Sequence, residues 1–241
     1  MMRFLAERLV SLASMLLLLA ASSTARASLA DDASAESNHG PPERVIIGLD
    51  LSTSNPLITN ASYAGSAAEL VAEDIKKLPM ASVVMIRTFG SYSGQRNNLR
   101  IDRQVSSQRD EKPTAVAALV QEIITNVPKL VRDGTLQSQE RTNIVPFLED
   151  MAEFVDCSKM DTTVILVSDG IEDSEYARLG RNRDDSLPRP SSASYRGCSE
   201  LEIVGLGQGA NSPSFTEHLR DEWNSWAKAA GFRNFDGLSD W

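Results

Sequence analysis

Residues 44–50 read Arg-Val-Ile-Ile-Gly-Leu-Asp, an apolar run that ends at an acidic side chain. Consecutive apolar residues, without the alternation of a half-exposed strand, are typical of a strand that is buried on both faces. Residues 162–168, Thr-Thr-Val-Ile-Leu-Val-Ser, show the same pattern more strongly. Four further strands are predicted, the second of them weak and the last a short edge strand: residues 82–89, 98–104, 201–206 and 232–238.

Segments with helical spacing separate most of these strands. Apolar residues recur every three or four positions in residues 63–78, 113–130, 143–155 and 213–230. Pro128 lies inside the second of these helices and is expected to bend or end it. Strands that alternate with helices form a parallel sheet with helices on both faces. The predicted fold class is therefore α/β, with a doubly wound, mostly parallel central sheet.

The first 42 residues are expected to lie outside this fold. Arg3 and Arg8 flank the start of an apolar run, and Ala25-Arg26-Ala27 has the small-x-small pattern of a signal-peptidase site. We predict a signal peptide at residues 1–27, a disordered leader at 28–42 and one domain at 43–241, with an uncleaved N-terminal anchor as the alternative. Export to a periplasm or out of the cell follows, with no membrane span after cleavage.

The charge of the chain restricts the class of partner. Its 241 residues include 33 Asp and Glu against 24 Lys and Arg, a formal net charge of −9 at pH 7. An acidic protein without basic clusters is a poor binder of nucleic acid or of an anionic membrane. The sequence therefore gives no support to either partner.

The two cysteines, Cys157 and Cys198, precede the fourth and fifth predicted strands. Export favours a disulfide over a metal-binding pair, and both cysteines are expected at the amino ends of neighbouring strands. A bridge there would close a loop of about 40 residues and contribute about 3–4 kcal/mol. Two free buried thiols are the alternative.

Polar side chains gather where two of the predicted strands end. Asp50, Ser52 and Ser54 follow the first strand, and alternate residues of an extended chain point to one side. Asp169 ends the fourth strand, and Thr142 starts the helix that leads into it. Since ligands of open α/β folds bind at the carboxyl edge of the sheet, we expect these five side chains to surround one point.

All five side chains offer oxygen atoms, the ligands that suit Mg²⁺ or Mn²⁺. Zinc is disfavoured because neither histidine nor cysteine belongs to the pattern. If the carboxylates act through water, neutral hydroxyls bind the metal directly and it stays electrophilic. A coordination position then remains open for an acidic group from another protein.

Asp50-x-Ser52-x-Ser54, Thr142 and Ser168-Asp169-Gly170 resemble the three parts of the metal-ion-dependent adhesion site (MIDAS) of von Willebrand factor A (vWA) domains. Residues 201–207, Leu-Glu-Ile-Val-Gly-Leu-Gly, are similar to the fifth strand of that family. The likeness covers residues 43–238, and its parts follow the order of the family.

The resemblance implies a Rossmann-like vWA fold that binds a protein partner through Mg²⁺. In that family the two serines and the threonine touch the metal, while the aspartates act mainly through water. The family's last helix, which follows the sixth strand and moves in integrin-type members, is missing before Trp241. We therefore expect rigid binding.

Residues 172–197 form an unusually long connection that leaves the carboxyl edge. Its bulky side chains are candidate partner contacts, unless the loop is merely mobile: Tyr176, Arg178, Arg181, Arg183, Arg189 and Tyr195. Glu172 and Asp173 could hold a second cation, but a solvated acidic turn is the favoured interpretation.

Three other functions fit the sequence less well. A Mg²⁺-dependent, phosphatase-like hydrolase with Asp50 as nucleophile normally has a second acid two residues later, where this chain has Ser52. A nucleotide site at residues 205–210 lacks the paired acid. A metal-free vWA scaffold is the remaining alternative. We expect a binding module, not an enzyme.

Overall fold

A computed structural model describes residues 40–91, 99–179, 185–210 and 212–239. The predicted signal peptide, and the predicted leader up to residue 39, lie outside the described residues. No helix in the described part of the chain is both long and apolar enough to cross a membrane.

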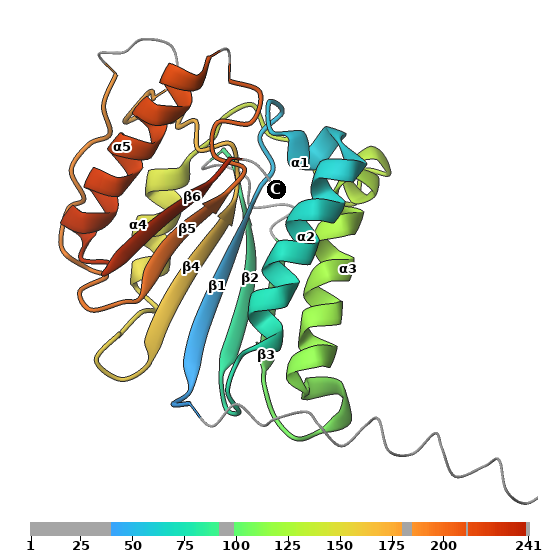
Figure 1. The fold of residues 1–241 in the computed structure, drawn as a ribbon. Helices are drawn as coiled ribbons and strands as arrows, with labels where there is room; N and C mark the ends of the chain where they lie inside the picture. Colours follow the sequence, from blue (N-terminus) through green and yellow to red (C-terminus); the bar gives the residue numbers. More distant parts are fainter. Residues whose placement is uncertain (1–39, 92–98, 180–184, 211, 240–241) are drawn as a thin grey trace, which may run out of the picture. The chain divides into compact units, whose positions relative to one another are not determined.

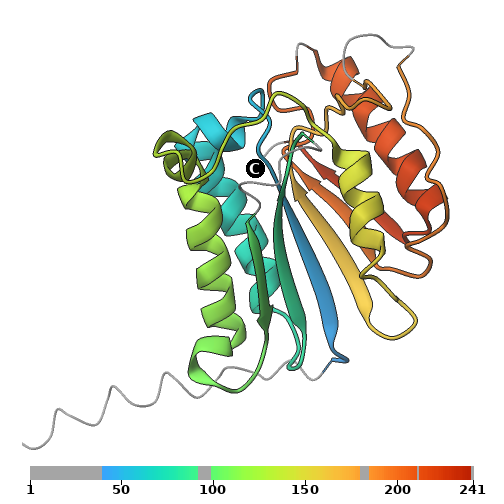
Figure 2. The same ribbon diagram turned by 180° about the vertical axis from the view of Figure 1, so that it is seen from behind.

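The described residues form one six-stranded sheet of order β3-β2-β1-β4-β5-β6. Five strands run parallel, and β3 at one edge pairs antiparallel with β2 (Figure 2). The strands are β1 Glu43–Asp50, β2 Val83–Phe89, β3 Arg100–Gln104, β4 Asp161–Val167, β5 Glu200–Val204 and β6 Asn234–Leu238. The short link between β2 and β3 explains the antiparallel pair, because only a longer crossover returns the chain in parallel.

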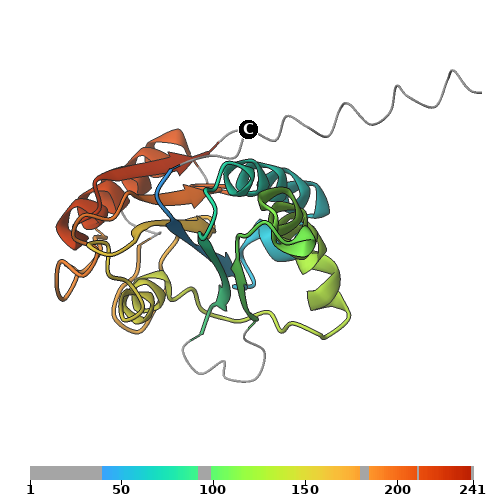
Figure 3. The same ribbon diagram turned by 90° about the horizontal axis from the view of Figure 1, so that it is seen from below.

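Helices cover both faces of the sheet, which confirms the doubly wound α/β class. Helices α2 and α3 lie on one face, and α4 and α5 lie on the other (Figures 1 and 3). The helices are α1 Pro56–Thr59, α2 Ala61–Lys76, α3 Pro113–Arg132, α4 Ile144–Ala152 and α5 Pro213–Ala230, with a 3₁₀ turn η1 at Arg109–Glu111.

Strand β1 lies in the middle of the sheet and separates the two halves of the core. Val45, Ile47 and Leu49 are buried against the α2–α3 layer, whereas Ile46 belongs to the α4–α5 layer. Gly48 points to the second layer as well, and a β-carbon there would lie 2.7 Å from side-chain atoms of both Phe147 and Leu166. A glycine at this position therefore lets Phe147 of α4 pack directly onto the sheet.

Pro128 was expected to bend or end its helix, and it does not end it, because α3 continues to Arg132. The proline costs the helix one backbone hydrogen bond. However, Pro128 is itself buried, together with Val120, Ile124 and Val127 on the same face. The free energy gained by burying this apolar face offsets the lost hydrogen bond, so the helix continues for one more turn after Pro128.

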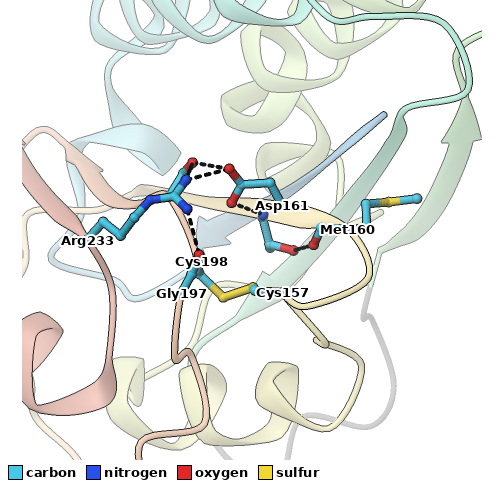
Figure 4. A network of polar contacts seen from close by, with 8 residues as sticks. Cys157, Met160, Asp161, Gly197, Cys198 and Arg233 are labelled. Carbon is cyan, nitrogen blue, oxygen red and sulfur yellow. Dashed lines mark hydrogen bonds and ion pairs between the residues drawn. A yellow bond between two sulfur atoms is a disulfide. The ribbon is translucent and has the colours of Figure 1, made fainter. Parts of the chain in front are cut away.

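The predicted disulfide is present at the amino edge of the sheet. Cys157 and Cys198 are bridged with their Cα atoms 5.1 Å apart, just before β4 and β5 (Figure 4). Beside it, Arg233 donates hydrogen bonds to the Gly197 carbonyl at 2.9 Å and to the Asp161 carboxylate at 2.5 Å. This edge is therefore held by a covalent bond and an ion pair, at the opposite end of the strands from the predicted site.

Candidate metal-binding site

Asp50 lies at the carboxyl end of β1, where both of its oxygens accept hydrogen bonds. The parallel register places Leu49 beside Val167, so that Asp50 meets the residue that follows β4. Ser168 Oγ donates to Asp50 Oδ2 at 2.7 Å, and the Ser52 backbone N–H donates to Asp50 Oδ1 at 2.8 Å. These bonds fix the carboxylate and connect the two loops that carry the predicted site.

Asp169 is held by the tight turn after β4. Its Oδ1 accepts a hydrogen bond from the Ile171 N–H at 2.9 Å. Gly170 has φ +74°, and a β-carbon there would lie 2.5 Å from Leu206 Cδ1. Trp223 Nε1 donates to the Gly170 carbonyl at 2.8 Å. Gly170 is therefore required by the backbone of this turn, which fixes the position of Asp169.

Thr142 reaches the same edge through an extended segment that crosses between the two loops. Gln139 exchanges backbone hydrogen bonds with Leu51 and Thr53, each at 2.8 Å. On the other side, the Asp173 N–H donates to the Thr142 carbonyl at 2.9 Å. The segment thus bridges the loop after β1 and the loop after β4, and it places Thr142 beside both.

The five predicted residues differ in solvent exposure: four are buried and one is exposed. Asp50, Ser52, Thr142 and Asp169 are at most 3% exposed. Ser54 is exposed. Among the described residues, the buried Ser52 Oγ makes no hydrogen bond of normal geometry, although it lies close enough to Asp50 to lower the pKa of that carboxyl. We call these five residues the edge site; four of them are buried, and Ser54, two residues after Ser52, is exposed.

The two carboxylates of the edge site carry unfavourable negative charge. Burial raises the pKa of Asp50, although hydrogen bonds from the Ser52 backbone and the Ser168 hydroxyl act in the opposite direction. Burial, followed by the charge of Asp50, raises the pKa of Asp169 to about 7. A positive charge between the two carboxylates would stabilise both ionised forms.

These observations fit a hard divalent cation. An unpartnered serine oxygen and two mutually repelling carboxylates form a donor set made only of oxygens, as Mg²⁺ and Mn²⁺ prefer. No group of three His, Cys, Asp or Glu side chains suited to a metal occurs in the described part of the chain.

Two further buried residues support the edge site and were not predicted. Glu172 is only 1% exposed, and its Oε2 accepts hydrogen bonds from the N–H groups of Ile144 at 2.7 Å and Val145 at 3.0 Å. The expectation of a solvated acidic turn is therefore wrong for Glu172, which caps α4. Burial raises its pKa to about 7.

Asn55 is the second of these residues. It is fully buried, and its Oδ1 accepts from the Leu57 N–H at 2.9 Å at the start of α1. Its side chain also lowers the pKa of Asp50, which places it close to that carboxylate. An Asn before Pro56 is a typical helix-start pattern, so the cap was readable from the sequence, whereas the contact with Asp50 was not.

The predicted partner contacts of the 172–197 connection divide into three groups. Tyr176 and Arg189 are exposed, and the Arg178 side chain is 71% exposed. Arg181 and Arg183 lie outside the described residues. Tyr195 is wrong as a partner contact, because it is buried, stacks on Phe232 and donates its hydroxyl proton to the Leu148 carbonyl at 2.5 Å.

Gly205, at the end of β5, has a steric reason for its identity. Its φ is +108°, and a β-carbon there would lie 1.8 Å from the hydroxyl oxygen of Tyr63. That hydroxyl donates to the Val204 carbonyl at 3.2 Å, so α2 is tied to the carboxyl end of β5. The absence of a side chain at Gly205 therefore leaves room for Tyr63 of α2. This packing explains the glycine without a bound nucleotide.

Comparison with known proteins does not place the chain in a family. No family model matches the sequence, and no curated protein matches it significantly.

Several solved structures resemble the domain at low sequence identity. The pilus adhesin SpaC of Lactobacillus rhamnosus GG is 13% identical with a TM-score of 0.48, over 83% of this chain and 28% of the adhesin. The manganese-loaded TRAP protein of Plasmodium vivax is 17% identical with a TM-score of 0.43, over 75% of this chain and 63% of TRAP. An aerotolerance-related membrane protein of Bacteroides fragilis is 13% identical with a TM-score of 0.41, over 81% and 91% of the two chains. At these values the likeness does not extend to function.

Proposed function

We propose that the domain is a vWA-like, protein-binding module. It engages an acidic group of its partner through a divalent cation, Mg²⁺ or Mn²⁺, held at the edge site. Asp50, Ser52, Ser54, Thr142 and Asp169 are the proposed metal-binding residues. We propose further that the protein is exported and that it is not an enzyme.

One observation carries this proposal: two buried carboxylates and a buried, unpartnered hydroxyl meet at the carboxyl edge. Asp50 and Asp169 lie on loops that a 2.7 Å hydrogen bond from Ser168 joins, and the Asp50 charge raises the pKa of Asp169. An ionised pair of this kind is costly unless a cation compensates it. Neutral side chains at these two positions would make the fold more stable than two carboxylates do. The presence of the pair therefore supports a role in binding.

The hydroxyl and carboxylate residues of the edge site would have different roles in binding the cation. The serine and threonine hydroxyls would be direct ligands that leave the cation's charge largely uncompensated. The aspartates would orient bound water and balance charge from further away. When bound, the cation supplies an electrophilic position that accepts a carboxylate oxygen of the partner. Ser54 is the exposed member of the set, so its hydroxyl would be the ligand most open to a partner.

The disulfide supports export. Disulfides persist in oxidising compartments and are rare in a reducing cytosol. The bridge between Cys157 and Cys198 therefore agrees with a periplasmic or secreted protein. The direct check is mass spectrometry of the protein from its native host, which should detect an N-terminus at Ser28 and an intact disulfide.

Metal binding is tested by thermal unfolding and calorimetry of the domain with and without Mg²⁺. A cation that binds only the folded state adds about 2.7 kcal/mol at a hundredfold excess over its Kd. Asp169→Ala should abolish this response. The matched control is Asp110→Ala, which removes an exposed acid from η1 and should respond like the wild type.

Asp169→Asn separates metal binding from folding. Because it removes one of two repelling buried carboxylates, it should be at least as stable as the wild type without metal. A wild-type domain that shows no Mg²⁺ response would contradict the proposal. Robust phosphatase turnover that is lost in Asp50→Asn would favour the hydrolase instead.

A further inference from the structure

A hollow with a volume of about 460 Å³ opens directly beside the edge site. Its lining residues come from the two sides of the Thr142 contact: Arg141, Ser174, Glu175, Tyr176, Ala177 and Arg178. Arg141 precedes Thr142 in the chain, and the Asp173 N–H donates to the Thr142 carbonyl at 2.9 Å. A ligand in this hollow, which we call the Arg141 hollow, would therefore lie next to one bound at the edge site.

The far wall of the Arg141 hollow is an ordered turn. The Ser174 N–H donates to the Ala177 carbonyl at 2.9 Å, and Ser174 Oγ accepts from the N–H groups of Tyr176 and Ala177. After the turn, the Leu179 N–H donates to the Glu172 carbonyl at 2.8 Å, and Leu179 is fully buried. The wall is thus anchored on both sides, so a ligand would bind without ordering it first.

The charges of the hollow leave one guanidinium without a partner. Arg141 is half-buried and has no hydrogen-bond or ion-pair partner in the described part of the chain. Arg178 pairs with Asp173 at 3.1 Å, but their side chains are 71% and 44% exposed, so the pair is weak. Glu175 is exposed and can turn toward solvent.

Tyr176 adds an aromatic surface to the same hollow. It is 75% exposed, more than the other exposed large hydrophobic side chains of the described residues, Met80 at 39% and Phe154 at 57%. Tyrosine and arginine, with tryptophan, are enriched among the side chains that carry most of the binding energy at protein interfaces. The exposed Tyr176 and Arg178 and the half-buried Arg141 are therefore suited to contact a partner.

We propose that the Arg141 hollow binds a second acidic side chain of the same partner segment whose first acidic side chain reaches the edge site. This inference rests on the proposed function and specifies its partner: an extended segment with two acids at a fixed spacing. The forked guanidinium of arginine matches a carboxylate in two parallel hydrogen bonds. Arg141 receives the second acid, Arg178 joins it by exchanging Asp173 for the incoming carboxylate, and Tyr176 covers the connecting residues.

The test uses blocked glycine-rich peptides that carry one glutamate and, in a second series, another glutamate two to five residues later. Affinities for the full domain are measured by calorimetry or NMR titration in saturating Mg²⁺. At one spacing the second glutamate should raise the affinity about fivefold, as for a partly exposed ion pair. Arg141→Gln should remove that gain and leave the single-glutamate peptide unaffected. Arg103→Gln, an exposed arginine on β3, is the matched control and should change neither affinity.

The outcomes separate the two proposals. If the single-glutamate peptide binds in Mg²⁺ but no spacing raises its affinity, the Arg141 hollow is not an acid-binding subsite and the proposed function survives. The same conclusion follows if the gain persists in the Arg141→Gln, Arg178→Gln double variant. If the single-glutamate peptide fails to bind in Mg²⁺, the proposed function is wrong and this inference falls with it.

Discussion

The carboxylate of Glu172 accepts a hydrogen bond from the backbone N–H of Ile144 at 2.7 Å, across 28 positions of sequence. The same oxygen accepts from Val145 at 3.0 Å, so a side chain from the loop after β4 caps helix α4. Thr142 lies two residues before that helix and Asp169 three residues before Glu172, so this contact ties together the two segments that carry them. The same two hydrogen bonds thus stabilise the start of α4 and help to position the residues of the edge site.

Removal of this acceptor is therefore expected to weaken both. Glu172→Gln keeps an oxygen that can accept from the Ile144 and Val145 N–H groups and removes a buried charge whose pKa folding raises, so it should not lose unfolding free energy at pH 8. Glu172→Ala leaves both N–H groups without that acceptor and should be about 1–2 kcal/mol less stable than Glu172→Gln, with weaker Mg²⁺ binding. Glu175→Ala, three residues later and exposed, is the matched control. Unchanged metal affinity in a destabilised Glu172→Ala protein would show that the cap serves the helix alone.

The stability of the domain should fall as the pH rises from about 4.5 to 8. Burial, then the charges of Asp74, Glu200 and Asp236, raises the pKa of Glu202 to about 8. A carboxyl whose pKa is raised by folding is stabilised in its protonated form, so stability declines from the unfolded pKa up to the folded one. Asp169 and Glu172, with pKa values raised to about 7, contribute to the same decline. Glu202→Gln should therefore reduce the decline in urea unfolding, most clearly between pH 7 and 8, whereas the exposed Glu217→Gln should not. An identical slope in Glu202→Gln would rule out Glu202 as a contributor.

The disulfide should contribute stability without affecting the edge site. It closes a separation of 41 residues at the amino edge, and its loss should cost about 3–4 kcal/mol on the chain-entropy estimate. The double variant Cys157→Ser, Cys198→Ser should unfold at lower denaturant while its Mg²⁺ affinity stays at the wild-type value. A large loss of metal affinity would mean that the two edges of the sheet are coupled.

Gly48→Ala should destabilise the centre of the sheet. The new methyl group would lie 2.7 Å from Leu166 Cδ2 and from Phe147 Cε1, so one of them must move. Overpacking of this kind costs about 1–3 kcal/mol, and Phe147→Leu in the same chain should recover part of it. Gly65→Ala is the opposite control: it lies in α2 with no atom within 4 Å of the new carbon, and it should stabilise by about 0.5–1 kcal/mol.

The sequence predicted the elements whose patterns are local. Strand β1 begins one residue before the predicted start and ends at the predicted Asp50, and α5 spans the predicted 213–230, because apolar periodicity determines which face is buried. The disulfide followed from the order of the strands. These features depend on spacing within one element or on the topology of neighbouring strands.

Features that depend on contacts between distant segments were not predicted correctly. Tyr195 reads as a loop side chain, but its ring fills the space beside Phe232. Glu172 reads as part of an acidic turn, yet its partners lie 27 and 28 residues earlier. Pro128 reads as a helix end, whereas burial of its face outweighs the lost hydrogen bond. In each case tertiary packing overrides a local preference.

The most direct test of the central claim is a crystal structure of the domain grown or soaked in Mn²⁺, with an anomalous difference map. The account predicts one strong peak at the carboxyl edge of the sheet, about 2.0–2.2 Å from the hydroxyl oxygens of Ser52, Ser54 and Thr142, with Asp50 and Asp169 around it. Asp169→Ala crystals should lack the peak. A wild-type map with no peak at this edge would contradict the account, provided that the Mn²⁺ concentration is high enough for exposed carboxylates elsewhere on the domain to bind it.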